Sequence, residues 1–412
     1  MSTRLITFVC AIFALAYAAA FINTARGPDG MVLDQHGRPQ LTDHLSLWSA
    51  GRLAAEGRPA QSYDWQAHAA RMAEAMQRTP DSPLQFSYPP SFLLVLSPFS
   101  SLPFETSLVL FGLLTLAPFA FLASRITGRP EAALWMLATV PPFWNFVVGQ
   151  TGALAATLLA AGLLLLPARP LLAGAMFGLL AFKPHLGLLV PVALLAAGYY
   201  RTIAAAALTA SVVALASVFA YGVEPWLAFA ASLSKFGAFA LADTNAAAYK
   251  MQSLFGFLRT FKVPAQIALA AQALLACALI ALTWRLWRRP GASDHAHDLK
   301  AGILLSSAVL VSPYAFHYDL TMLTLAQAFL LRHALAASDA PATEIPQRDL
   351  IVILAVNALI MIFPPLSVPT GFLASLVLTA ALLHRLSESE PVLLARFASF
   401  CAPARAAYRA TS

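Results

Sequence analysis

Long apolar runs recur along almost the whole chain, and arginines and prolines separate them. Runs of about 18 or more apolar residues are typical of helices that cross a membrane, where the helix satisfies its own backbone polar groups. The composition agrees, because 59% of the residues are hydrophobic and 11% are charged, against about 25% charged in soluble domains. The sequence therefore predicts an all-α polytopic membrane protein with about twelve transmembrane helices.

The expected spans follow one another with short connections, except at two places. We expect a first outer loop at 23–102, whose apolar stretch 89–98 is a re-entrant or interfacial helix, and a second outer loop at 222–263. Residues 1–385 form one transmembrane domain in this interpretation, and residues 386–412 form a basic cytoplasmic tail. The expected spans are 5–22, 103–123, 131–147, 151–166, 171–182, a sixth up to Tyr200, a seventh up to Tyr221, 264–286, a ninth up to Ser312, a tenth up to Arg332, 350–363 and 371–383.

The arginines predict the orientation of these spans. With the N-terminus inside, the arginines of the short connections all fall on the cytoplasmic side, as the positive-inside rule requires. The formal net charge of +7 then reflects cytoplasmic arginine, and we expect no nucleic-acid partner. The arginines concerned are Arg125, Arg129, Arg169, Arg201, Arg285, Arg288, Arg289, Arg332, Arg348 and Arg385.

The first apolar block resembles a signal peptide at its end, where residues 16–20 read Ala-Tyr-Ala-Ala-Ala. Its basic start is weak, because it holds only Arg4, and we expect an uncleaved first span. The three cysteines, Cys10, Cys277 and Cys401, have a spacing that indicates neither a metal site nor a disulfide.

The first outer loop is the polar part of the chain, and it carries the candidate for the centre of the chemistry. Thr42-Asp43-His44 opens one amphipathic run, and Ser62-Tyr63-Asp64-Trp65 opens another. Asp43 has two interpretations: it caps the N-terminus of a helix, or it is a general base that takes a proton from an attacking hydroxyl. His44 is expected either to tune Asp43 or to face water, and it is also a candidate contact for a sugar or an acceptor.

Lys183-Pro184-His185 lies between two apolar spans, on the side that the positive-inside rule leaves uncharged. Lys183 could extend to the lipid headgroups, but an ionisable residue at this place is a functional candidate by default. A compact cation suits a phosphate or pyrophosphate on a lipid carrier, and His185 is grouped with it. In the second outer loop, Lys250, Arg259 and Lys262 are expected over anionic headgroups, or one of them at the donor phosphate.

Four further residues are candidate contacts for a sugar or an acceptor. Tyr88, followed by Pro89-Pro90, has a structural turn as its alternative, and Gln150 follows a glycine that could form a plain tight turn. His317 and Tyr318 belong to a polar cluster, together with Tyr314 and Asp319, at the outer end of a span.

Several common motifs are missing from the sequence: His-Glu-x-x-His, the Walker loop, the nucleotide-binding glycine pattern and Asp-x-Asp. We therefore expect no metal, no cofactor, and neither ATP nor a nucleotide sugar as the donor. A lipid-linked donor requires none of these motifs.

The ordered set of these motifs resembles glycosyltransferase family 87, the polyprenol-dependent membrane glycosyltransferases. The resemblance covers roughly residues 40–320 and rests on the order of the pieces, none of which is specific alone. The pieces are Asp43, Trp48-Ser-Ala-Gly51, Gly57, Tyr63-Asp64, Phe86-Ser-Tyr-Pro-Pro90, Gly149-Gln150, Phe182-Lys-Pro-His185 and Ser312-Pro-Tyr followed by His317.

This resemblance implies a GT-C-type bundle with juxtamembrane helices in the first outer loop. It also implies transfer of a hexose, such as mannose, from a polyprenyl-phosphate carrier to a glycan or glycolipid acceptor. The site would face outward from a bacterial inner membrane, and the family's acidic base corresponds to Asp43. The identity of the sugar stays open, because Gln150 is followed by Thr151-Gly152, where many relatives carry Asn.

Two other classes stay open on the residues alone. A lipid or sugar transporter also places ionisable residues within helices, but it is expected to show inverted repeats, and no half-to-half symmetry is evident here. A polyprenyl-linked oligosaccharide ligase or polymerase is expected to have its main outer loop late in the chain, whereas the largest outer loop here comes first.

Overall fold

The computed structural model describes residues 2–27, 30–80, 84–241, 248–289, 294–336 and 344–390. Within these residues every regular element is a helix, and the only β-type pairings are isolated bridges. The all-α class is therefore confirmed for the described part of the chain. Most of the expected basic tail, residues 391–412, and part of the second outer loop, residues 242–247, lie outside the described residues.

Among the described residues, five helices are long and apolar enough to cross a membrane. Two of them, α1 and α11, are only 6% buried across their most apolar windows, so their apolar side chains are left for lipid. The five are α1 (Thr3–Thr24), α5 (Phe104–Thr127), α11 (Tyr200–Tyr221), α14 (Ala265–Trp287) and α19 (Thr370–Ser389).

The other expected spans are present as helices, but most are too short to cross alone. The 14 residues of α8, at about 1.5 Å each, extend for about 21 Å, against a hydrocarbon core of about 30 Å. The expected number of about twelve full spans is therefore not confirmed. These helices are α6 (Ala132–Leu137), α7 (Val140–Val148), α8 (Gly152–Leu165), α9 (Pro170–Leu179), α10 (Leu189–Ala197), α15 (Asp294–Val311), α16 (Thr321–Ala336), α17 (Gln347–Met361) and α18 (Phe363–Leu366).

Proline explains why several of these helices stop early. Pro184 lacks the amide hydrogen that a continuous helix needs, so α9 ends in a 3₁₀ turn, η3 (Leu180–Phe182), and a second turn, η4 (Pro184–Gly187), leads into α10. Pro313 follows α15 in the same way, before η6 (His317–Leu320) opens α16. The chain thus makes helical hairpins whose tips lie between two short helices.

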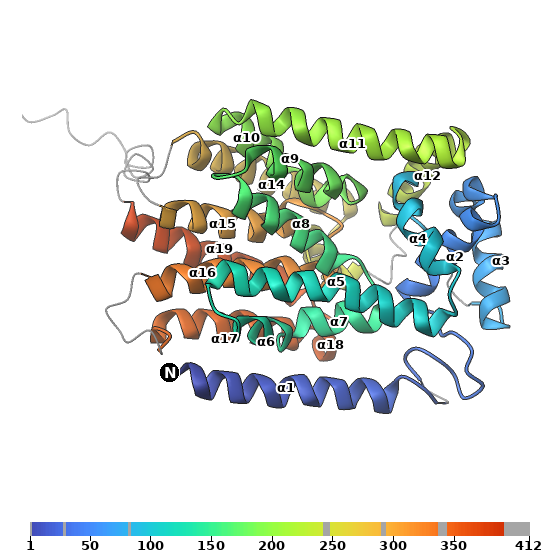
Figure 1. Cartoon of the computed structure of the whole chain (residues 1–412), viewed down its shortest axis with the longest axis horizontal. Coiled ribbons are helices and arrows are strands. Elements are labelled where there is room, and N and C mark those ends of the chain that lie inside the picture. The colour runs from blue at the N-terminus through green and yellow to red at the C-terminus, as the bar shows by residue number, and fades with distance from the viewer. Residues whose placement is uncertain are drawn as a thin grey trace, which may run out of the picture.

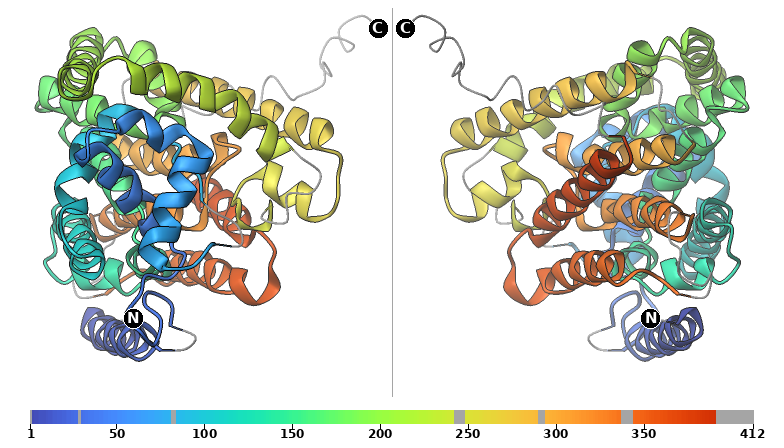
Figure 2. Two further views of the ribbon diagram at one scale, coloured as in Figure 1. Left: turned by 90° about the vertical axis from the view of Figure 1, so that its right-hand side faces the viewer. Right: turned by 90° about the vertical axis from the view of Figure 1, so that its left-hand side faces the viewer.

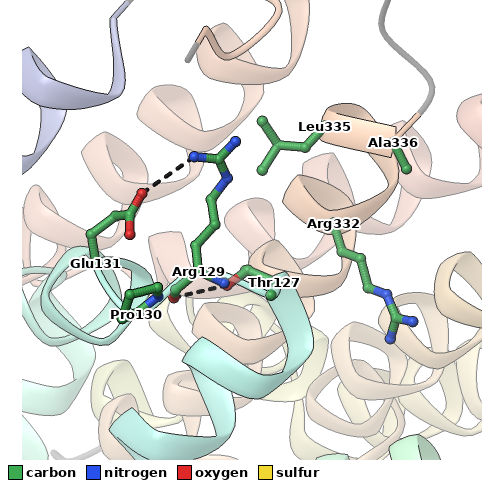
Figure 3. A pocket seen from close by; sticks show the side chains of 8 residues that line it. Thr127, Arg129, Pro130, Glu131, Arg332, Leu335 and Ala336 are labelled. Carbon is green, nitrogen blue, oxygen red and sulfur yellow. Dashed lines mark hydrogen bonds and ion pairs between the residues drawn. The ribbon is translucent and has the colours of Figure 1, made fainter. Parts of the chain in front are cut away.

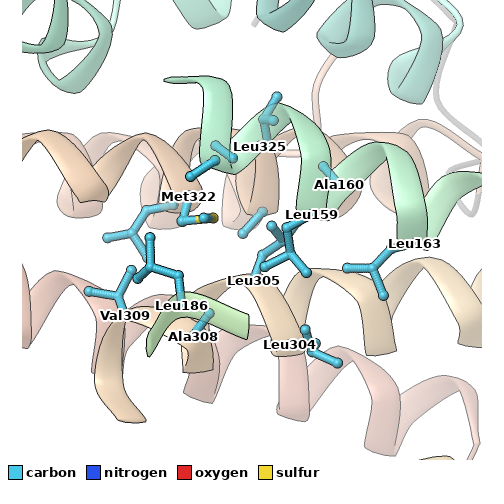
Figure 4. Close-up of a cluster of buried hydrophobic side chains, with 14 of the residues drawn as sticks. Leu159, Ala160, Leu163, Leu186, Leu304, Leu305, Ala308, Val309, Met322 and Leu325 are labelled. Carbon is cyan, nitrogen blue, oxygen red and sulfur yellow. The ribbon is translucent and has the colours of Figure 1, made fainter. Parts of the chain in front are cut away.

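The hairpins pack around an apolar core of leucine, alanine and phenylalanine. Figure 4 shows its centre, where Leu159 and Leu163 of α8 meet Leu305 of α15 and Leu325 of α16. Each of these four side chains is at most 1% exposed, so the hairpins are held by close packing between short helices.

Figure 1 shows the helices running roughly along one axis, with the first outer loop gathered at one end. There α5 and α11 extend farther than α8 toward this end, so the tip of α8 is recessed. Figure 2 (left) faces the loop helices that lie over this end. They are α2 (Asp43–Ala55), η1 (Pro59–Tyr63), α3 (Trp65–Met76), η2 (Pro90–Phe92), α4 (Leu93–Ser100) and, from the second loop, α12 (Glu224–Leu241), with η5 (Ala248–Lys250) and α13 (Leu254–Thr260) following.

At the opposite end of the bundle lie Arg348 and Arg385, two of the arginines that the sequence assigned to one side. Ser2 pairs with Glu344 through an isolated bridge, and Arg385 forms a buried ion pair with Asp349. The exposed Arg348 pairs with Glu388. These contacts bring segments near both ends of the chain to one face of the bundle.

Candidate active site

Three helical hairpin tips converge beneath the N-terminus of α2. The first tip joins α7 to α8 at residues 149–151, the second holds Lys183 between η3 and η4, and the third is η6. Their polar side chains come from segments far apart in the sequence, and Lys183 and Asp319 alone are 136 residues apart. This polar cluster, defined by Asp43, Tyr88, Gln150, Thr151, Lys183 and Asp319, is the candidate active site.

Asp43 is the first residue of α2 but does not cap it. The N-cap is Thr42, whose side-chain oxygen accepts a hydrogen bond of 3.3 Å from the amide of Leu45. The capping interpretation of Asp43 is therefore wrong, since its neighbour has that role. The Asp43 carboxylate instead lies beside Gln150, whose hydrogen bond favours its ionised form, and within electrostatic range of Lys250 and Lys183.

Burial is the main cause of the altered acidity of Asp43. It raises the pKa of this carboxyl from 3.8 to about 6, although Lys250, Lys183 and the Gln150 hydrogen bond each favour the ionised form. A carboxylate with this pKa is mostly ionised at neutral pH and is more basic than an ordinary aspartate. These are the properties that a general base needs.

A chain of hydrogen bonds runs through the cluster toward Asp43. Lys183 Nζ lies 3.2 Å from Thr151 Oγ1, which lies 2.9 Å from the hydroxyl of Tyr88. Tyr88 donates its single proton to Gln150 Oε1 over 2.7 Å, so the bond between Tyr88 and Thr151 is donated by the threonine. Gln150 Oε1 also accepts from the amide of Thr151 over 3.0 Å, so both of its lone pairs are used and its amide nitrogen is the group left to interact with Asp43.

Lys183 is 4% exposed, and its ammonium group is fully used inside the protein. Its three donors meet Asp319 Oδ1 at 2.6 Å, Thr151 Oγ1 at 3.2 Å and the ring of Tyr318, whose centroid lies 4.7 Å away. Asp319 is in turn fixed by the amide of Phe316, which donates to Oδ2 over 3.0 Å. The expected phosphate contact does not fit Lys183 in this geometry.

Two glycines allow the tips to come this close. A Cβ added at Gly152 would lie 2.1 Å from the Tyr318 carbonyl oxygen, and one at Gly149 would lie 2.4 Å from Cβ of His44. Gly149 also has a φ of 67°, in the left-handed region that ends α7 and turns the chain toward Gln150. The Gly149-Gln150-Thr151-Gly152 sequence is therefore needed for packing as well as for its polar groups.

His44 does not face the cluster or water, which corrects both expectations. It is 1% exposed, and its ring nitrogens lie 3.3 Å from the Gly149 carbonyl and 3.0 Å from Ser107 Oγ. Burial lowers the pKa of His44 to about 4, so the imidazole is neutral and donates to Gly149. His44 thus holds α2 against the first tip rather than contacting a sugar.

Two histidines beside the cluster keep a polar atom without a partner. His185 Nε2 and His317 Nδ1 are buried and form no hydrogen bond. His317 lies between aromatic rings, T-shaped against Trp144 at 6.1 Å and stacked on Phe363 at 6.1 Å. Buried, unpaired nitrogens of this kind are suited to hydrogen bonds with a substrate.

Tyr318 is the remaining expected sugar contact. It lies beside the cluster, where its ring packs against Lys183. Its ring covers the Lys183 ammonium and stacks on Phe316 at 5.7 Å. Asp319, its neighbour, was visible in the sequence as part of a polar cluster but not as the partner of a lysine.

The basic residues of the second outer loop have different positions. Arg259 donates to the Val263 carbonyl over 2.9 Å, and Lys262 is exposed beyond the end of α13. Lys250, the third of the basic residues singled out in this loop, is exposed and acts electrostatically on both Asp43 and His317. The sequence grouped it with Arg259 and Lys262 and did not separate the three.

Among the residues that the structure describes, no group of three or more His, Cys, Asp or Glu side chains could hold a metal ion. Cys10 and Cys277 are free thiols in two different helices. The candidate site is thus built from hydrogen-bonding groups and one charged pair.

A hollow of about 520 Å³ lies at the opposite end of the bundle, between the end of α5 and the end of α16. Figure 3 shows Arg129 and Glu131 paired at its wall, with Arg332 across from them. Arg332 is itself paired with Asp298 at 3.1 Å. Because its charged groups already have partners, we place the chemistry at the cluster beneath α2 instead.

A multi-pass helical bundle with a partly buried carboxylate and polar hairpin tips beneath loop helices fits a membrane-embedded enzyme. The comparison with known families is more specific. The family model of glycosyltransferase family 87 matches residues 86–313, which is more than half of the chain. No curated protein and no solved structure matches the chain. The chain belongs to glycosyltransferase family 87, and it is a membrane glycosyltransferase.

The match contains Tyr88, Gln150, Thr151 and Lys183 of the cluster. Asp43 lies before it and η6 lies shortly after it. In the folded protein, Asp43 lies beside Gln150 and Asp319 pairs with Lys183, so residues on both sides of the matched segment contact residues within it.

Proposed function

We propose that this protein transfers a hexose, with mannose as the leading candidate, from a polyprenyl-phosphate carrier to a glycan or glycolipid acceptor. The transfer takes place on the outer face of a bacterial inner membrane and inverts the anomeric configuration. Asp43 is the general base, and the bundle is of the GT-C type. The single observation that supports this most is the position of Asp43 at the end of a directed hydrogen-bond chain, with a pKa of about 6.

The reaction requires one proton transfer and one displacement. Asp43 takes the proton of an acceptor hydroxyl, whose oxygen forms a bond to the anomeric carbon. The bond between that carbon and the phosphate oxygen breaks on the opposite face, and the electron pair leaves with the polyprenyl phosphate. One base and a site that stabilises the departing phosphate are sufficient for such an inverting displacement.

The position of the cluster suits substrates of this kind. The recessed tips lie beneath α2 near the end of the bundle, where a lipid chain can remain in the bilayer while its headgroup meets the loop helices. His185 and His317 offer unpaired nitrogens there for hydroxyl groups of the sugar or acceptor.

The proposal is tested by giving the purified protein three donors in turn, in lipid nanodiscs with extracted acceptor glycans and glycolipids. The donors are polyprenyl-phosphate mannose, polyprenyl-phosphate glucose and GDP-mannose. We expect transfer from a polyprenyl-linked sugar and none from the nucleotide sugar, with opposite anomeric configuration in the product by NMR. Transfer from the nucleotide sugar, or retention of configuration, would contradict the proposal.

A further inference from the structure

The Lys183–Asp319 pair carries no net charge toward a substrate. Both side chains are almost completely buried, at 5% and 0% exposure, and the ammonium and carboxylate are 2.6 Å apart. A buried pair of this kind is electrically balanced, and breaking it is costly because one charge is left without compensation. A phosphate that approached Lys183 would have to displace Asp319, Thr151 or the Tyr318 ring.

Lys250 is different, because its charge is open to the surface. It ends η5 on the second outer loop, is exposed, and forms no ion pair with any carboxylate of the described residues. Its ammonium group lies 6.0 Å from the ring centroid of Tyr249 and acts electrostatically on Asp43 and His317. It is thus a cation within range of the proposed base and of an imidazole with an unpaired nitrogen.

The backbone beside Lys250 is fixed to the third hairpin tip. The amide of Gln252 donates to the Ala315 carbonyl over 2.6 Å, and Met251 forms an isolated bridge with Phe316. The side chain of Gln252 continues this attachment, since its Oε1 accepts from the amide of Gly371 over 2.9 Å. These bonds fix the backbone next to Lys250 to the third hairpin tip, and the side chain of Lys250 is exposed.

We propose that Lys250 is the cation that contacts the phosphate of the lipid carrier, and that Lys183 is a positioning residue that acts through Thr151, Tyr88 and Gln150. This inference rests on the proposed function and assigns the phosphate contact of that same site. In the displacement, the phosphate changes from a diester with one negative charge to a monoester with up to about two. Lys250 therefore stabilises a charge that grows as the sugar leaves.

The test measures binding of polyprenyl phosphate, the leaving group itself, to full-length protein in nanodiscs of zwitterionic lipid. Lys250→Met is expected to weaken binding by about 10- to 100-fold, the usual range for loss of a hydrogen bond to a charged group. Lys250→Arg is expected to keep most of it. Lys262→Met is the matched control. The sequence grouped Lys262 with the same phosphate candidates, but it is an exposed lysine beyond the end of α13, and binding by its variant should stay within about 2-fold of wild type.

The double variant Lys183→Met with Asp319→Asn tests the other half of the inference. It removes both charges together, so binding of polyprenyl phosphate should stay within about 3-fold of wild type while transfer falls with its KM little changed. Loss of binding in the double variant, with wild-type binding in Lys250→Met, would overturn the inference. Because Lys250 is exposed, its variants should fold, and they test the phosphate contact even if the buried double variant does not fold.

Two further arms identify the source of the phosphate. Inorganic phosphate and vesicles with anionic phospholipid are offered in place of the carrier lipid. If Lys250→Met weakens only the binding of anionic vesicles, Lys250 is a headgroup contact and the inference is wrong. If wild-type protein does not bind polyprenyl phosphate at all, both the proposed function and the role of Lys250 fail. If wild-type protein binds it and Lys250→Met binds it equally well, only the role of Lys250 fails.

Discussion

The rate of transfer should fall in acid because Asp43 must be ionised to accept a proton. Burial raises its pKa from 3.8 to about 6, so the group binds its proton more strongly in the folded protein than an ordinary aspartate. Activity is therefore fully present above this pKa and is lost as the pH falls through it. About nine-tenths of the carboxyl is ionised one pH unit above the pKa, and about one-tenth is ionised one unit below.

The assay is the initial rate of sugar transfer at limiting donor in nanodiscs, between about pH 4.5 and pH 8. We expect the rate to fall on the acidic side as a single group is protonated, with a midpoint near pH 6. Well below that midpoint, the rate should fall about tenfold for each pH unit. Lys250→Met should move the midpoint upward, because a nearby cation that favours the ionised carboxylate is removed. A limb centred near the ordinary aspartate value, or a rate independent of pH, would refute this reasoning.

Three further predictions concern the packing and the polar contacts of the bundle. Tyr88→Phe removes the hydroxyl between Thr151 and Gln150 and should lower kcat by about 10-fold, while the melting temperature changes little, as measured by transfer and thermal unfolding. Gly152→Ala should abolish folding by size-exclusion chromatography, because its Cβ would lie 2.1 Å from a backbone oxygen; Gly187→Ala, with 3.5 Å to a side chain, should fold normally. Arg385→Met should destabilise the protein by about 3–5 kcal/mol in thermal unfolding, because its buried aspartate loses compensation, whereas loss of the exposed ion pair in Arg348→Met should cost less than about 1 kcal/mol.

Hydropathy predicted where the helices lie but not how far they extend. The apolar stretches before and after Lys183 resemble full spans, yet α9 and α10 are short helices that meet at a hairpin tip. A short helix whose ends are buried in protein satisfies its backbone there and has no need to reach both membrane surfaces. Pro184 was the visible signal for the break, and only the packing of the neighbouring helices gives its consequence.

The start of α2 was predictable because Thr42-Asp43 precedes an amphipathic run, and the structure places Asp43 in a polar cluster. The sequence could not show which of Thr42 and Asp43 caps the helix, since both residue types favour the N-cap position; the structure assigns the cap to Thr42. His44 was missed as a packing residue because its partners, Gly149 and Ser107, come from other helices.

The two lysines show the same limit for charge. Lys183 was recognised as a candidate by its place between apolar runs, but its neutralisation depends on Asp319, 136 residues away. Lys250 was grouped in the sequence with Arg259 and Lys262, and the attachment of Gln252 to Ala315 is what distinguishes its position. Tertiary contacts of this kind leave no periodic pattern in a sequence.

The most direct test of the account is the rate of a single turnover with Asp43→Asn, against Asp64→Asn as a matched control. Asp64 is an exposed aspartate of the same loop that caps α3 by accepting from Ala67 over 2.8 Å, and asparagine keeps that cap. If Asp43 is the base, Asp43→Asn should lose about 10²- to 10⁴-fold in rate in correctly folded protein. Asp64→Asn should change the rate by less than about 2-fold. A wild-type rate in Asp43→Asn would contradict the assignment of the base, and with it the central claim.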